Sequence, residues 1–158
     1  MPNFMQNFER RARKQQRGIV VIEAAIILPV VLFLILAIAE LCNAMLQYNV
    51  LTRSIRDSAR YAANVAEAGA GVQVVLSATK ISTTQNIAVY GKTVAGTPIL
   101  PGLAPGNITV SVVNNQDILV AAQYPYQPLF AGKIPALVGD GDAGGTFTMN
   151  AQVRMRVL

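Results

Sequence analysis

The sequence has 158 residues, of which 53% are hydrophobic and 13% are charged, so its composition lies on the membrane side of an average soluble protein. Histidine and tryptophan are absent and Cys42 is the only cysteine, which excludes an internal disulfide, a thiolate zinc cluster and any site built on imidazole. The chain also lacks a G-x-S-x-G motif, a phosphate-binding glycine–lysine loop and an H-E-x-x-H motif. We therefore expect neither an enzyme nor a bound cofactor, metal ion or small-molecule substrate.

The net charge of +5 at pH 7 is concentrated at the N-terminus. Residues 1–18 carry five basic residues and one acidic residue, whereas residues 19–158 carry eight basic and seven acidic residues. A protein that binds nucleic acid usually carries its positive charge on the folded domain, so this distribution argues against that function. Lysine and arginine beside an apolar segment stay on the cytoplasmic side of a membrane. We expect residues 1–18 to be a cytoplasmic leader.

A long apolar segment, Ile19 to Ala39, follows the basic stretch and contains one charged residue, Glu23, and one proline, Pro29. As a helix it is about 31 Å long, close to the thickness of the hydrocarbon core of a bilayer. The segment is therefore predicted to span the membrane once, with residues 40–158 on the periplasmic side of the inner membrane. We expect Pro29 to kink this helix, because proline lacks an N–H and crowds the preceding turn.

Two kinds of processing fit the segment. An ordinary secretory signal ends in a small-x-small site, and Ala37-Ile38-Ala39 would release a protein that begins at Glu40. Cleavage before the apolar segment, after Gly18, instead makes Ile19 the first residue and Glu23 the fifth. That order, with a basic leader, a glycine, about twenty apolar residues and a glutamate at the fifth position, looks like the type IV prepilin signal, which implies cleavage by prepilin peptidase.

Glu23 has a physical role in this interpretation. A carboxylate inside the membrane costs about 2.5–3.5 kcal/mol and is expected to have a partner. Cleavage after Gly18 creates a new cation, the α-amino group of Ile19. In filaments of the prepilin class the glutamate is thought to neutralise that group on a neighbouring subunit. The alternative is that Glu23 lies near the membrane interface, where the cost is small.

A narrower resemblance covers Arg17 to Ala63, whose sequence is RGIVVIEAAIILPVVLFLILAIAELCNAMLQYNVLTRSIRDSARYAA. Its glycine, its glutamate five residues later, its Leu28-Pro29 pair and its Arg60-Tyr61-Ala62-Ala63 end resemble the TadE-like family of pilus-assembly pseudopilins. Residues 87–103 and 120–129 also look like segments of that family. The resemblance implies a minor pilin of the Tad (tight adherence) system that builds Flp pili. It also implies other Tad pilins and the inner-membrane assembly platform as partners; the major Flp pilins are much shorter chains.

The apolar helix is predicted to continue past the membrane to about Ala68, with Gly69 and Gly71 as its stop. Apolar residues recur there at three- and four-residue steps, and we expect this stripe to pack against the protein's own domain. The stripe comprises Leu41, Met45, Tyr48, Leu51, Ile55, Ala59, Ala62 and Ala66. The polar residues are expected on other faces of the helix, namely Asn43, Gln47, Arg53, Asp57 and Arg60. Cys42 is expected to be a small packing residue.

The remaining residues predict a small α+β head. Residues 72–90 are expected to be helical. Residues 91–107, which are rich in glycine and proline, are expected to form a loop. Ile108–Val113 and Ile118–Tyr126 flank Asn114-Asn115, which predicts a hairpin. Alternation over Thr146–Val157 predicts a half-buried strand whose inward residues begin at Phe147.

Together these elements predict a long membrane-spanning helix that continues into a periplasmic domain with a three-stranded antiparallel sheet packed on it. Tyr124-Pro125-Tyr126 is expected to be the end of a strand rather than an exposed adhesive patch. Two functions are compatible with this architecture. The first is a Tad minor pilin or pseudopilin required for pilus biogenesis and adherence, and the second is a secreted or membrane-tethered binding module with an ordinary signal sequence or anchor.

Overall fold

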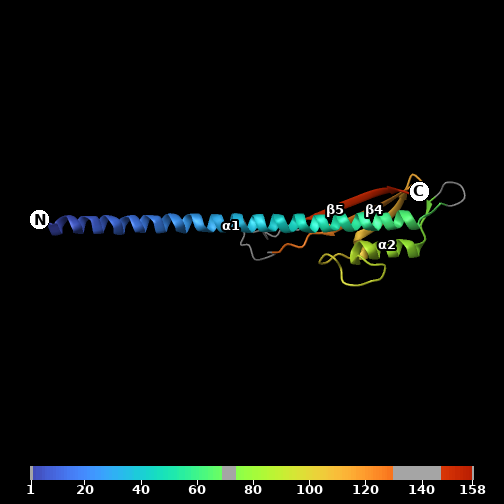
Figure 1. Cartoon of the computed structure of the whole chain (residues 1–158), viewed down its shortest axis with the longest axis horizontal. Coiled ribbons are helices and arrows are strands. Elements are labelled where there is room, and N and C mark those ends of the chain that lie inside the picture. The colour runs from blue at the N-terminus through green and yellow to red at the C-terminus, as the bar shows by residue number, and fades with distance from the viewer. Residues whose placement is uncertain (1, 69–73, 130–146, 158) are drawn as a thin grey trace. The chain divides into compact units, whose positions relative to one another are not determined.

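The computed structural model describes residues 2–68, 74–129 and 147–157, with the side chains of residues 2–19, 67 and 68 outside the description. The chain divides into two compact units, Met1–Leu41 and Cys42–Leu158. Figure 1 shows a long helix, a second short helix and antiparallel strands. The elements in chain order are α1 (Pro2–Val65), β1 (Glu67–Ala68), β2 (Val74–Val75), α2 (Ala78–Tyr90), the 3-10 helix η1 (Pro105–Asn107), β3 (Ile108–Val113), β4 (Asp117–Pro125) and β5 (Thr148–Arg156). The predicted α+β class is confirmed.

Helix α1 runs from Pro2 to Val65 and includes Pro29 in its interior. It begins within the basic stretch, which the sequence had not predicted to be helical, and it ends about three residues earlier than expected. The expected end at Ala68 is wrong because Glu67 and Ala68 form β1, which pairs antiparallel with β2. Backbone pairing with β2, which follows six to eight residues later, therefore overrides the local helical preference of the alanines. The predicted stop glycines lie outside the described residues.

The first unit presents an apolar helix to its surroundings. Side chains from Val20 to Ile38 are largely exposed, and none of the most apolar stretch of α1 is buried within the chain. α1 is the one helix among the described residues that is long and apolar enough to cross a membrane. This helix is a candidate single membrane span near the N-terminus.

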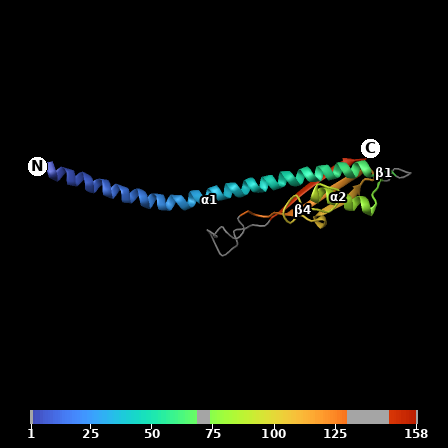
Figure 2. The same cartoon turned by 60° about the horizontal axis from the view of Figure 1, so that its bottom comes forward.

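In the second unit, β3, β4 and β5 form the predicted three-stranded antiparallel sheet, and their order in it is β3-β4-β5. The hairpin between β3 and β4 pairs Val113 with Asp117. Asn114 and Asn115 turn the chain with φ angles of 53° and 59°, a left-handed conformation that asparagine tolerates better than other side chains do. Figure 2 shows the sheet strands and α2 beside the C-terminal part of α1.

The second helix, α2, begins at Ala78 rather than at residue 72, because Val74 and Val75 form β2. Ser77 caps its N-terminus by accepting a hydrogen bond from the backbone N–H of Lys80, and Gly91 closes its C-terminus in a left-handed conformation. Residues 91–107 form the predicted loop except for the short helix η1. The predicted helix is thus confirmed from Ala78 to Tyr90.

The core of the second unit lies between one face of α1 and the sheet. Leu51 and Ile55 of α1 are fully buried, as are Ile118 and Val120 of β4, and all four belong to one apolar cluster. Small side chains let the layers approach closely, and the buried alanines are Ala59, Ala62, Ala88, Ala122 and Ala151. Truncating a residue such as Leu51 to alanine in this core is expected to cost about 2–5 kcal/mol.

The predicted apolar stripe of α1 is correct only in its second half. Leu51, Ile55, Ala59 and Ala62 are buried, whereas Leu41, Met45 and Tyr48 are 62%, 61% and 46% exposed. Before Leu51, the face of α1 that packs against the domain carries the polar residues Asn43 and Gln47 instead. Asn43 and Gln47 make hydrogen bonds to residues at the end of the sheet, so the expectation that they lie on other faces is wrong. Arg53, Asp57 and Arg60 are exposed, as expected.

Candidate functional site

The candidate processing site lies on α1 in the first unit. Gly18 and Ile19 are consecutive residues of this helix and directly precede the apolar segment that begins at Val20. The helix carries basic residues before the Gly18–Ile19 bond and apolar residues after it. This order places the bond at a change from charged to apolar sequence.

Glu23 is exposed on the same helix and is surrounded by apolar side chains. Its neighbours on one face of α1 are Val20, Ala24, Ile27 and Leu28. Among the side chains that the structure describes, none is seen in a hydrogen bond or ion pair with Glu23. The carboxylate therefore stands on an apolar surface and is available to a positive group outside this part of the molecule.

Pro29 lies one and a half turns beyond Glu23 in the interior of α1. Its ring removes the hydrogen bond that the carbonyl of Ala25 would otherwise accept. Membrane helices tolerate such a proline when neighbouring groups satisfy the freed carbonyl. The kink expected at Pro29 stays a prediction.

A second candidate site lies in the head, where α1 meets the end of β4. The hydroxyl of Tyr124, which is fully buried, lies 2.9 Å from Oε1 of Gln47 and 2.9 Å from the carbonyl oxygen of Pro101. Nε2 of Gln47 donates to the carbonyl of Gln127 at 3.1 Å, which fixes the orientation of its amide. Burial raises the pKa of Tyr124 above its ordinary value of 10.0 because the phenolate would be desolvated.

A second amide–tyrosine pair lies one helical turn before the first. Nδ2 of Asn43 donates to the hydroxyl of Tyr126 at 3.1 Å, and the ring of Tyr126 stacks on Phe147 with a centroid separation of 4.9 Å. Tyr126 is 2% exposed, so Tyr124-Pro125-Tyr126 ends a strand as predicted and is not an adhesive patch. We call Asn43, Gln47, Tyr124 and Tyr126 the amide–tyrosine clamp.

The sequence interpretation missed the clamp. The signal was present, because Asn43, Gln47, Leu51 and Ile55 follow one another at four-residue steps, which places them along one helix face. Gln47 is 9% exposed and its polar groups are satisfied, which allows a polar residue to lie in the core. The buried face of α1 therefore begins with amides and continues with aliphatic residues.

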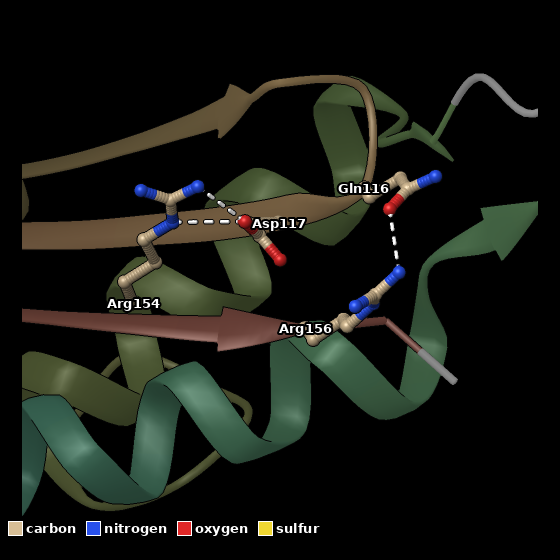
Figure 3. A network of polar contacts seen from close by, with 4 residues as sticks. All are labelled: Gln116, Asp117, Arg154 and Arg156. Carbon is tan, nitrogen blue, oxygen red and sulfur yellow. Dashed lines mark hydrogen bonds and ion pairs between the residues drawn. The ribbon is translucent and has the colours of Figure 1, made fainter.

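The end of the sheet opposite the clamp carries the charged side chains of Asp117, Arg154 and Arg156, which Figure 3 shows. Nε of Arg154 donates to Oδ2 of Asp117 at 2.9 Å, and Arg156 donates to Oε1 of Gln116 at 2.7 Å. The Arg154 side chain is half exposed, so its ion pair with Asp117 contributes little to stability, and this end of the strand is solvated.

No metal-binding arrangement is found in the ranges that the structure describes, since they contain no cluster of three or more His, Cys, Asp or Glu side chains. Cys42 is exposed on α1, so its predicted role as a packing residue within the chain is wrong. The helix turns it away from the face that packs on the sheet.

Residues 18–60 match the family model described as TadE-like protein. The match begins at Gly18, contains Glu23 and Pro29, and ends on the packed part of α1 at Arg60. Residues 87–103 and 120–129, which we had also expected to belong to segments of that family, lie outside the match. No curated protein and no solved structure matches the chain. The chain thus carries a TadE-like segment, consistent with the TadE-like family of pilus-assembly proteins, and this supports a pilin-like protein associated with a Tad pilus.

Proposed function

We propose that the protein is a minor pilin or pseudopilin of a Tad-type (Flp) pilus, made as a precursor and cleaved by prepilin peptidase between Gly18 and Ile19. Its role is structural: it takes part in pilus biogenesis and adherence and performs no catalysis. The mature protein is anchored in the inner membrane by residues 19–39, with residues 40–158 in the periplasm, and it enters the pilus from that position. Its partners are other Tad pilins and the inner-membrane assembly platform.

One observation carries the proposal: the TadE-like match starts at Gly18, at the junction between basic and apolar sequence on α1. Glu23 then occupies the fifth position after the proposed cut and lies on an apolar helix face. A free ammonium at Ile19 and a carboxylate at Glu23 are both costly in an apolar environment, and pairing them between subunits offsets that cost. Because two charged groups must meet, such a pair also fixes the axial offset between neighbouring subunits.

The test is the mass of the mature protein, measured on the intact chain purified from membranes of the native host. The proposal expects an N-terminus at Ile19 in wild-type cells and an uncleaved leader in cells that lack prepilin peptidase. An N-terminus at Glu40 in both strains would contradict the proposal and support the secreted binding module. A leader that remains in wild-type cells would also contradict it.

The predicted topology has its own test. A reporter that is active only in the periplasm, fused after Leu158, is expected to be active, because the basic residues before Gly18 hold the N-terminus in the cytoplasm. An inactive fusion that is present at normal abundance would place the head in the cytoplasm and would remove the anchored-pilin model.

A further inference from the structure

The exposed surface of α1 does not become polar where the predicted membrane span ends. Beyond Ala39, the exposed side chains up to residue 50 remain mainly apolar: Leu41, Cys42, Met45, Leu46, Tyr48, Asn49 and Val50. From residue 53 onward the exposed side chains are instead mainly charged: Arg53, Arg56, Asp57 and Arg60. The change from apolar to charged therefore occurs just after Val50, three turns beyond Ala39.

Other exposed apolar residues lie at the same end of the head. Phe147 is 51% exposed and borders a groove of about 330 Å³ together with Met45, Tyr48 and Met149. The backbone carbonyl of Phe147 accepts a hydrogen bond from the N–H of Tyr126, and the hydroxyl of Tyr126 accepts one from Asn43. The charged side chains of β5, Arg154 and Arg156, occupy the opposite end of that strand.

The length of the apolar surface matches a whole bilayer better than its hydrocarbon core. From Val20 to Val50, α1 is about 46 Å long, whereas the core is about 30 Å thick and the bilayer with both headgroup layers is about 40–45 Å thick. A span that stopped at Ala39 would leave the eleven residues from Glu40 to Val50 in water, although most of the exposed side chains among them are apolar. Tyrosine is enriched in the headgroup layer, where its ring is in contact with lipid and its hydroxyl with water.

We propose that Met45, Leu46, Tyr48 and Val50 of α1, together with Phe147, form a collar that lies in the outer headgroup layer of the membrane. Lipid is the occupant that fits, because these α1 positions point in several directions around the helix and continue directly from the membrane span. A single partner helix would cover only one stripe at three- and four-residue spacing. The inference rests on the membrane anchor of the proposed function and is independent of the pilus.

The absence of tryptophan makes the collar directly measurable, because one introduced indole is the only one in the protein. Three variants of the full chain are reconstituted separately into phosphatidylcholine nanodiscs: Leu46→Trp in the collar, Leu32→Trp in the span and Arg56→Trp beyond the collar. All three positions are exposed, so the head core is left intact, and thermal unfolding checks this. Lipids brominated close to the headgroup or near the chain ends quench indoles at those depths.

The expected result is that bromines close to the headgroup strongly quench Leu46→Trp, bromines near the chain ends quench Leu32→Trp, and neither set quenches Arg56→Trp. A blue-shifted but unquenched emission from Leu46→Trp would show that protein covers the collar and would overturn the proposal. A water-like, unquenched emission would also overturn it. Loss of quenching at Leu32→Trp would instead mean that the anchor itself fails, which is the failure of the proposed function.

Discussion

Gln47 on α1 and Tyr124 on β4 are joined by a hydrogen bond of 2.9 Å although 77 residues separate them in the sequence. The bond lies at the end of a mainly apolar interface between the helix and the sheet. Both partners have further contacts, with Gln127 and Pro101, so no polar atom of this pair is left without one. The net energy of a hydrogen bond between two buried polar groups is smaller than the cost of leaving one of them without a partner. The pair therefore favours the one register of helix against sheet in which both are bonded.

Replacing Gln47 by alanine is expected to destabilise the head by about 1–3 kcal/mol, because the carbonyl of Gln127 loses its donor in a part-buried site. Urea unfolding of the full chain in nanodiscs, followed by circular dichroism, measures the change. Gln123→Ala is the matched control, since Gln123 is an exposed glutamine on β4. Equal losses of unfolding free energy in the two variants would show that the clamp does not stabilise the head.

Tyr124 predicts a loss of stability at alkaline pH. Its pKa is raised in the folded state by burial, so the folded protein holds the phenol proton more tightly than the unfolded chain does. The stabilisation is complete below the unfolded pKa of about 10 and decreases as the pH rises from there through the folded pKa. Free energies of unfolding are measured from about pH 8 to about pH 11, a range that brackets the pKa of the unfolded state. They are expected to fall more steeply for wild type than for Tyr124→Phe. Parallel curves would contradict the prediction.

Replacing Gly18 by leucine is expected to block processing, because the side chain would sit beside the proposed scissile bond, where glycine leaves room for the enzyme. The precursor should migrate more slowly on a gel by the mass of residues 1–18. Gly18→Ala, which adds one methyl group, is the mild control and should be cleaved at least in part. Normal mobility of Gly18→Leu would count strongly against the prepilin signal.

Replacing Glu23 by alanine is expected to leave cleavage and membrane insertion intact but to prevent association with partner pilins. The ammonium of Ile19 then has no carboxylate partner in an apolar environment. Glu23→Gln should have a milder effect, since it keeps a hydrogen-bond acceptor. Crosslinking to other pilins and counts of surface pili measure the outcome, and Ile22→Ala controls for a change to the neighbouring exposed residue. Normal assembly by Glu23→Ala would remove Glu23 from the functional residues.

The sequence predicted those parts of the fold that depend on local pattern. The alternation of buried and exposed residues along β5 and the Asn114-Asn115 turn were visible in the residue order, and both are confirmed. Alternation failed at Phe147, expected to point inward but half exposed, because this residue lies just before the strand. The strands β1 and β2 were missed because two residues are too few to show a period.

The candidate sites divide in the same way. Gly18, Ile19 and Glu23 are recognisable from spacing along one helix, and the TadE-like match begins at the first of them. The clamp is different, because Gln47 becomes a core residue only when Tyr124 and Gln127 reach it from the far side of the domain. A glutamine between aliphatic residues is ordinarily assigned to the surface, since an unsatisfied amide in a core is costly. Nothing local in the sequence shows that its hydrogen bonds are satisfied.

The order β3-β4-β5 has a consequence for how the protein is made. The buried face of α1 is covered by strands that follow it in the chain by some 50 to 100 residues, and β5 is the last of them. Because α1 is synthesised first, Leu51 and Ile55 remain uncovered until the hairpin and then β5 have been made. Contacts between such distant segments form slowly, because a long loop must close before they contribute. The nascent head is therefore most prone to aggregation and to proteolysis in the interval before β5 docks.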